Sequence, residues 1–318
     1  MIKIIIMGMT SFILAVITGK ILIPIFESLK LGQYIREDAP KEHRKKSGVT
    51  TFGAVIFIIP TLIIILFNIE RVDNEIKFII ISFIIFAFVG FIDDFLKKIH
   101  KRNEGLAIMQ KFILLTIAIT YCVCYFKTNL NLDTSIIVPF IKKTLDLKIF
   151  YIPFIIFMYM SMTNAVNLTD GLDGLAGGVS VIVVTFLGVV SFLFKKYSIC
   201  AVCIVLMASL LGFLKYNKHP AKIIMGDTGA LALGGVITSI AIVLKLQLII
   251  PIIGVVYLIE ALTTVIQIVF FKITGKRFFR MAPIHHAFEL EGWSEVTIVN
   301  SFYIVTAIMC LLGFLSLL

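Results

Sequence analysis

Long hydrophobic runs alternate with short polar segments along nearly the whole chain. Ten of these runs approach or exceed the roughly 20 apolar residues that an α-helix needs to cross a bilayer. This pattern predicts an all-α, polytopic integral membrane protein with about ten transmembrane helices. The runs cover residues 3–27, 48–68, 77–92, 109–127, 149–165, 176–194, 198–215, 228–245, 247–271 and 297–318.

Composition supports the same class of protein. The chain has 318 residues, of which 59% are hydrophobic and 15% charged, whereas a soluble domain carries about 25% charged residues. Ten helices use most of the length, so we expect residues 1–318 to form a single transmembrane domain. The first run follows only three residues and lacks a small-residue cleavage site, which predicts a retained helix and not a signal peptide.

The distribution of Lys and Arg predicts how the helices are oriented. With ten spans, the odd-numbered loops carry eighteen of these residues, against ten in the even-numbered loops and the N-terminus. Positive residues favour the cytoplasmic side, so we expect the odd loops in the cytoplasm and both termini outside. We assign the net charge of +10 to orientation, to attraction for anionic lipid and to a polyanionic substrate, and not to nucleic acid.

Five acidic residues stand at the edges of hydrophobic runs, where a carboxylate is costly and usually functional. They are Asp93, Asp94, Asp170, Asp173 and Asp227. All five fall in odd loops, so helix counting places them on one face of the membrane. A face lined with carboxylates suggests a divalent cation, and Mg²⁺ binds through one or two carboxylates together with substrate phosphates. The loops that would build this site are 28–48, 93–110, 165–176, 215–229 and 272–296.

Each acidic motif also has a structural interpretation. Asp93 and Asp94 could be a solvated helix end paired to Lys97 or Lys98. The segment 167–174 could be a polar turn between helices. Asp227 could be the N-cap of the helix that follows it.

Two further groups of polar residues lie near the last helices. His285 and His286 follow a basic stretch and suit hydrogen bonding or proton donation to phosphate near neutral pH, although a surface loop could also hold them. Glu260 and Gln267 lie seven residues apart on one face of the ninth run, where a buried contact between helices is the simpler interpretation. Pro251 and Gly254 predict a kink in that run.

These motifs together resemble the phospho-N-acetylmuramoyl-pentapeptide transferase family, nearly from end to end. The most discriminating piece is Met281-Ala282-Pro283-Ile284-His285-His286 with Phe288-Glu289 and Gly292-Trp293. The other matching segments are Gly32-Gln33 with Arg36-Glu37, His43 and Lys45-Lys46; Asp93-Asp94; Asn103 with Gly105-Leu106 and Lys111; Asn167 to Ala176; Tyr216-Asn217 with Pro220; and Met225-Gly226-Asp227-Thr228-Gly229.

The resemblance implies a homodimer in the bacterial cytoplasmic membrane, with a Mg²⁺-dependent active site facing the cytoplasm and a groove for a prenyl chain. It implies Asp227 as the Mg²⁺ ligand, and Asp93, with Asp94 beside it, as the group that deprotonates or positions the lipid phosphate. His285, His286 and Gln267 would contact the nucleotide sugar or the pyrophosphate. The residues implied to hold the uridine diphosphate are Lys46, Thr51, Lys111, Asn167, Asp170, Asp173 and Asn217.

The chain departs from the family pattern at several positions, none of which removes an implied catalytic group. Val49 to Ala54 differ from the usual Thr-Pro-Thr-Met-Gly-Gly, and Asp38-Ala39-Pro40 stands where Asp-Gly-Pro is expected. Ile224 replaces an aromatic that would stack on uracil. Ala230 replaces a usual Ser, and Ala287 replaces a third His.

The implied reaction transfers phospho-MurNAc-pentapeptide from UDP-MurNAc-pentapeptide to undecaprenyl phosphate, giving lipid I and UMP. A related transferase that uses UDP-N-acetylglucosamine is the nearest alternative, but that group carries a differently spaced His motif. A secondary transporter is the other alternative, because polar residues in membrane helices often mark ion paths. Transporter sites lie near the bilayer midplane and often show repeat symmetry, whereas these acids cluster at one face and no repeat is visible.

Overall fold

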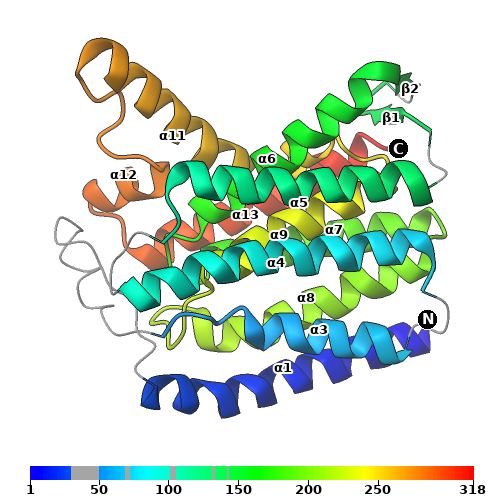
Figure 1. Cartoon of the computed structure of the whole chain (residues 1–318), viewed down its shortest axis with the longest axis horizontal. Helices are drawn as coiled ribbons and strands as arrows, with labels where there is room; N and C mark the ends of the chain where they lie inside the picture. Colours follow the sequence, from blue (N-terminus) through cyan, green and yellow to red (C-terminus); the bar gives the residue numbers. More distant parts are fainter. Residues whose placement is uncertain (30–49, 69–71, 101–104, 131–132, 142) are drawn as a thin grey trace.

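The computed structural model describes residues 1–29, 50–68, 72–100, 105–130, 133–141 and 143–318, and it is a bundle of roughly parallel and antiparallel helices (Figure 1). Within these residues, nine helices are long and apolar enough to cross a membrane. They are α1 (Ile2–Ser28), α4 (Asn74–His100), α5 (Ile108–Asn129), α6 (Tyr151–Thr169), α7 (Leu175–Leu193), α8 (Tyr197–Asn217), α9 (Gly226–Val243), α11 (Val255–Thr274) and α13 (Glu295–Leu315).

The remaining run, the second along the chain at 48–68, also forms an apolar helix, α3 (Val55–Asn68), which has 14 residues. The prediction of an all-α membrane protein is therefore confirmed, and each of the ten runs contains one main helix. The predicted boundaries differ most from the structure at 77–92, because α4 continues for two more turns to His100. Its last turn contains Lys97, Lys98 and His100, and positive side chains there suit the helix dipole.

The ninth run breaks where Pro251 and Gly254 predicted a kink. A short helix, α10 (Ile250–Ile253), ends at Gly254 and α11 begins at once. Figure 1 shows that α11 leans away from the other helices and ends beyond them. Its exposed side chains include Leu262, Val265 and Phe271, as expected of a helix that faces lipid.

A small β-hairpin, absent from the sequence-based expectations, joins α5 to α6. Strand β1 (Ser135–Val138) pairs antiparallel with β2 (Lys143–Asp146), with Ser135 opposite Asp146. A 3-10 turn, η1 (Lys148–Phe150), leads into α6. An ion pair joins Asp133 before the hairpin to Lys245 after α9, and hydrogen bonding by this lysine lowers the pKa of the Asp133 carboxyl to about 2.

Helix α9 is the centre of the bundle, and glycines bring its neighbours close. A Cβ at Gly235 would lie 2.3 Å from the Phe86 ring of α4, and one at Gly234 would lie 2.5 Å from Thr163 Cα of α6. A Cβ at Gly90 of α4 would lie 2.2 Å from the Asp227 carbonyl oxygen. Small residues allow such close approaches between membrane helices. The approach at Gly90 holds the start of α9 against α4.

Both chain termini and the hairpin lie at one end of the bundle, on the right in Figure 1. The end of α4, the start of α9 and the short helix α12 (Ile284–Leu290) lie at the opposite end, on the left. The polar motifs predicted to share a face therefore share one end of the structure. We call this the acidic end.

The close contact at Gly90 predicts that a larger residue there lowers the thermal stability of the protein. Replacing Gly90 with Ala should displace the first turn of α9, because the clash is with backbone atoms that cannot rotate away. Overpacking costs about 1–3 kcal/mol, so we expect a lower thermal midpoint for the detergent-solubilised protein. Gly188→Ala is the matched control, since its nearest neighbour is the Cys203 side chain at 3.1 Å. Equal midpoints for the two variants would refute the close-packed α4–α9 contact.

Candidate active site

Carboxylates from other parts of the chain hold the first turn of α9. Asp94 of α4 accepts hydrogen bonds from the Thr228 N–H (2.9 Å), the Thr228 hydroxyl (2.7 Å) and the Asp227 N–H (3.2 Å). Asp170, just after α6, accepts from the Gly226 N–H at 3.2 Å. The first N–H groups of a helix have no partner within the helix and favour negative charge. Asp94 and Asp170 therefore cap α9 from outside.

The structural interpretation of Asp227 as a helix N-cap is wrong. Asp227 is the second residue of α9, and the N-cap of this helix is Met225. Gly226 before it has φ +76°, and a Cβ there would lie 2.7 Å from an oxygen of Asp94. Glycine at this position thus permits both the backbone turn and the close approach of Asp94.

The Asp227 carboxylate joins those of Asp93 and Asp94 in one cluster. Each of the three offers an oxygen atom, and these atoms all lie within 4.8 Å of one another. Asp93 and Asp94 are only 2% and 5% exposed. Adjacent residues on a helix point about 100° apart, yet both acids of α4 reach the Asp227 carboxylate at the start of α9. We call this group the carboxylate cluster.

Two lysines neutralise part of the cluster. Lys97 Nζ lies 2.6 Å from Asp93 Oδ2 and 3.0 Å from Asp227 Oδ1. Lys111 of α5 binds the other Asp227 oxygen. The pairing of Asp93 with Lys97 is therefore correct. The Asp93 carboxylate is buried, however, whereas the Lys97 side chain is partly exposed in the last turn of α4.

The chain beyond α4 returns to Asp93. The Leu106 N–H donates to Asp93 Oδ1 at 2.9 Å, and a Cβ at Gly105 would lie 2.5 Å from the Asp93 carbonyl oxygen. A side chain at position 105 would thus separate the loop from α4. Both oxygens of Asp93 are engaged, one by the loop and one by Lys97.

This cluster has the chemistry of a divalent cation site. Mg²⁺ prefers oxygen ligands and uses few carboxylates, with phosphates and water completing its shell. With every group ionised, three carboxylates face two ammonium groups, which leaves negative charge in a largely buried position. Burial, together with the nearby charge of Asp227, raises the pKa of the Asp170 carboxyl well above its usual range.

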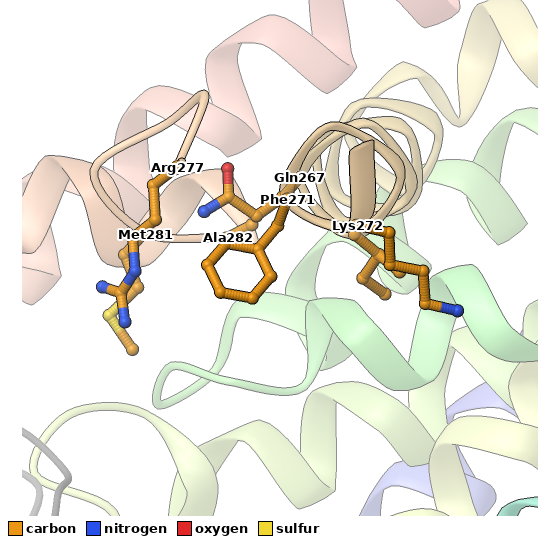
Figure 2. A pocket seen from close by; sticks show the side chains of 7 residues that line it. Gln267, Phe271, Lys272, Arg277, Met281 and Ala282 are labelled. Carbon is orange, nitrogen blue, oxygen red and sulfur yellow. The ribbon is translucent and has the colours of Figure 1, made fainter. Parts of the chain in front are cut away.

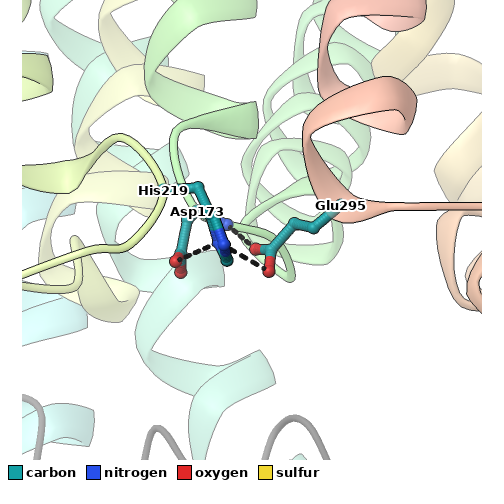
Figure 3. A group of neighbouring side chains, drawn as sticks. All are labelled: Asp173, His219 and Glu295. Atoms are coloured by element: carbon teal, nitrogen blue, oxygen red, sulfur yellow. Dashed lines mark hydrogen bonds and ion pairs between the residues drawn. The ribbon is translucent and has the colours of Figure 1, made fainter.

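A second group of charged residues holds Asp173, at the end of the loop between α6 and α7 (Figure 3). Asp173 Oδ2 lies 3.2 Å from His219 Nδ1 and accepts from the Ala221 N–H at 3.0 Å. Glu295, the first residue of α13, accepts from the Asp173 N–H and lies 3.2 Å from the same His219 nitrogen. These contacts fix the loop against α13. The three side chains also lie close enough together to hold a metal ion.

Asn217 fastens the same loop from the side of α8. Its side chain accepts from the Gly174 N–H at 3.1 Å and donates to the Ile223 carbonyl at 2.9 Å, and the residue is buried. Tyr303 of α13 donates to the Gly174 carbonyl at 2.6 Å. Asn167, in the last turn of α6, is half-buried. The segment 167–174 is therefore a braced loop, more rigidly held than the plain polar turn that was the alternative.

The segment that contains Thr51 lies beside the chain entering α9. The Gly53 N–H donates to the Ile224 carbonyl, and the Ile224 N–H donates to the Thr50 carbonyl, both at 2.9 Å. These bonds bring Thr51 to the acidic end, next to Ile224. Lys46, predicted to bind substrate, lies outside the described residues.

His285 connects α12 to α11 and to the loop 167–174. Its Nδ1 lies 2.9 Å from Glu260 Oε2, and both residues are fully buried. Its Nε2 lies 2.2 Å from the position that a Cβ would take at Gly171. The alternative that placed His285 in a surface loop is therefore wrong. The buried contact expected for Glu260 is confirmed. His286 is half-buried, with Nδ1 2.7 Å from Glu289 Oε2.

Gln267 of α11 lies apart from the carboxylate cluster and holds the segment after α11. Its Oε1 accepts from the Phe278 and Phe279 N–H groups at 3.0 and 2.9 Å. Figure 2 shows the pocket that it borders, between α11 and the segment leading to α12. The pocket is lined by Gln267, Ile268, Phe271, Lys272, Arg277, Met281 and Ala282.

Comparison with known proteins identifies the family. Residues 76–245 match the model of glycosyl transferase family 4. A Clostridium novyi phospho-N-acetylmuramoyl-pentapeptide-transferase is 50% identical over 309 residues, which cover 97% of this chain and 95% of the relative. Those of Clostridium kluyveri and Clostridium perfringens strain 13 are 50% and 47% identical, over all and 99% of both chains.

The chain belongs to the phospho-N-acetylmuramoyl-pentapeptide-transferase family. The resemblance drawn from the motifs is thereby confirmed. Membership does not test the role of any single residue in this chain, so the implied roles remain predictions. What the structure adds is their placement: Asp93, Asp94, Lys111 and Asp227 meet directly, and Asp170 caps the same helix.

Sequence reasoning missed three residues of the acidic end. Lys97 appeared only as an alternative partner of the acids, although its spacing of four from Asp93 on a helix is a recognisable signal. His219 and Glu295 were not singled out. Glu295 looks like an ordinary acidic residue in the first turn of a helix, and only the three-dimensional structure shows that it reaches Asp173.

The capping role of Asp94 is testable without substrate. Replacing Asp94 with Ala removes the acceptor of three hydrogen bonds at the start of α9. Buried donors left without a partner cost about 1–3 kcal/mol, so Asp94→Ala should unfold at a clearly lower temperature than the wild type. Asp94→Asn, which keeps one acceptor oxygen, should lie between them. A midpoint for Asp94→Ala at or above the wild-type value would contradict the capping role.

Proposed function

We propose that this protein transfers phospho-MurNAc-pentapeptide from UDP-MurNAc-pentapeptide to undecaprenyl phosphate, forming lipid I and releasing UMP. The names of relatives that are half identical over the full length support this substrate pair. The observation in the structure that carries the proposal is the carboxylate cluster with its two lysines at the start of α9. It is suited to a cation and a diphosphate at one end of a transmembrane bundle.

In the proposed reaction, an oxygen of the lipid phosphate attacks the β-phosphorus of the nucleotide sugar. A new phosphorus–oxygen bond forms to the lipid, the bond to the bridging oxygen breaks, and UMP leaves with the electron pair. A lipid phosphate is already largely ionised at neutral pH, so a general base contributes little. Positioning and electrostatic stabilisation should supply most of the rate.

The residues of the cluster have separate tasks in this proposal. Asp227 would hold Mg²⁺, with Asp93 or Asp94 nearby, and Asp93 would position the lipid phosphate. The chemistry that Mg²⁺ supplies when bound is neutralisation of charge on the diphosphate and the departing UMP. Lys111 is placed to bind a phosphate oxygen, and Asp94 maintains the first turn of α9.

The braced loop and its neighbours would bind the rest of the nucleotide sugar. Asn167, Asp170, Lys46 and Thr51 are proposed to hold the uridine diphosphate portion. Asp173 and Asn217 belong to the same set, and their contacts indicate that they act by shaping the loop.

His285, His286 and Gln267 are proposed to contact the sugar or the pyrophosphate. Nε2 of the buried His285 has no hydrogen-bond partner among the described residues. It faces Gly171, so a contact with substrate would require the loop 167–174 to shift.

The charge distribution and the fold support a proposal for the membrane setting. We propose a multi-pass protein of the bacterial cytoplasmic membrane, with the acidic end in the cytoplasm, both termini outside, and two copies forming a homodimer. The apolar side chains of α11 would face the lipid and the prenyl chain of undecaprenyl phosphate. The relatives do not favour UDP-N-acetylglucosamine as the sugar donor, and the placement of the acids at one end does not favour transport.

The proposal predicts that Asp227→Asn is the most damaging single change. Loss of the metal ligand should lower the rate of UMP release by about 10²-fold or more, the size typical for removal of one electrostatic stabiliser. Asp133→Asn, at the opposite end of the bundle, is the control and should keep the wild-type rate. Transfer of radiolabel from UDP-MurNAc-pentapeptide to undecaprenyl phosphate, with and without EDTA, measures this.

Three outcomes would refute parts of the assignment. A normal rate for Asp227→Asn at ordinary Mg²⁺ would show that Asp227 is not a metal ligand. Transfer that persists in EDTA would show that the reaction does not need a metal. Transfer from UDP-N-acetylglucosamine but not from UDP-MurNAc-pentapeptide would show that the proposed sugar donor is wrong.

A further inference from the structure

The ammonium group of Lys97 lies inside the carboxylate cluster. Its Nζ is 2.6 Å from Asp93 Oδ2, 3.0 Å from Asp227 Oδ1 and 3.7 Å from Asp94 Oδ1. Lys97 therefore pairs with all three acids, whereas Lys111 pairs with Asp227. A positive charge thus already stands where the three carboxylates would bind a divalent cation.

Lys97 and a metal ion cannot both keep this position. Mg²⁺ requires oxygen ligands at about 2.0–2.1 Å, and Lys97 already lies against one oxygen of Asp93 and one of Asp227. Two cations a few ångströms apart also repel each other strongly in a site of low dielectric constant. The side chain of Lys97 is 31% exposed, against 4% for those of Asp93 and Asp94, so it has an open side toward which it can move.

We propose that Lys97 is an exchangeable counter-ion. Without metal, it occupies the cation position and stabilises the cluster; when a divalent cation binds, it leaves the carboxylates and binds a phosphate oxygen of the substrate. The first half depends only on the geometry of the cluster. The second half rests on the proposed function, because that function supplies the diphosphate.

The exchange would make cation binding and anion binding support each other. With all groups ionised, the three carboxylates, Lys97 and Lys111 carry one net negative charge, and a divalent cation reverses it to one positive. The displaced ammonium group and the reversed charge both favour an incoming diphosphate. Competition from Lys97 should in turn keep the metal affinity low until that anion arrives.

Metal binding by the full-length protein in detergent tests the first half without substrate. Electron paramagnetic resonance of free Mn²⁺ would give the affinity of the wild type, Lys97→Met, Lys97→Arg and Lys98→Met. Lys97→Met removes the competing charge and should bind Mn²⁺ at least about tenfold more tightly. Lys97→Arg keeps the charge, and Lys98→Met removes a neighbouring one, so both should resemble the wild type.

Thermal unfolding gives a second readout and controls for folding. In EDTA, Lys97→Met should unfold at a lower temperature than the wild type, since three carboxylates then lose one of their counter-ions. Mg²⁺ should restore its midpoint, whereas the wild-type midpoint should change little. A Lys97→Met protein that is restored by Mg²⁺ is folded, so its metal affinity can be interpreted.

The proposal is overturned if Lys97→Met binds Mn²⁺ no more tightly than the wild type, or if Mg²⁺ fails to restore its midpoint. The second half is overturned if Lys97→Met, at saturating Mg²⁺, keeps the wild-type kcat/KM for UDP-MurNAc-pentapeptide; we expect a loss of at least about tenfold, with a smaller loss for Lys97→Arg. A wild type that binds Mn²⁺ but transfers nothing would refute the proposed function while leaving the exchange intact.

Discussion

The first turn of α9 is held by carboxylates that come from other helices, and the acidic end is organised around that contact. Asp94 of α4 and Asp170 after α6 accept hydrogen bonds from N–H groups that a helix leaves without partners. Because Asp94 performs the capping, Asp227 can turn its own carboxylate toward Asp93. Gly90 and Gly226 let the backbones approach closely enough for these bonds to form. A carboxylate cluster that could hold a cation is thus a consequence of how two helices are joined.

Carboxylates gathered in a mostly apolar bundle would repel one another without positive partners. Lys97 and Lys111 supply those partners from two different helices. The same arrangement that makes the cluster stable also sets its chemistry, because ammonium groups near a cation site are placed to meet phosphate. The proposed binding of an anionic substrate would therefore depend on the same contacts that join α4, α5 and α9.

Hydrophobic patterning predicted the ten helices and placed the acidic motifs at one end, since long apolar runs and helix counting are strong signals. It could not predict the extension of α4 beyond Asp94, because charged residues there resemble a loop. Nor could it distinguish Asp94, which caps α9, from Asp93, which faces Lys97, since adjacent acids look alike in a sequence. The bracing of Asp173 by Glu295 joins residues more than a hundred positions apart and leaves no local pattern.

The central claim is that Asp93, Asp94 and Asp227 form one cation site in which Lys97 stands when no metal is bound. A crystal structure of the protein with Mn²⁺ and a uridine diphosphate ligand, with the metal located by its anomalous scattering, tests this most directly. The account predicts a single strong peak bound to Asp227 beside Asp93 and Asp94, with Lys97 moved onto a phosphate oxygen. A peak at Asp173, His219 and Glu295 instead, with Lys97 still among the three carboxylates, would contradict it.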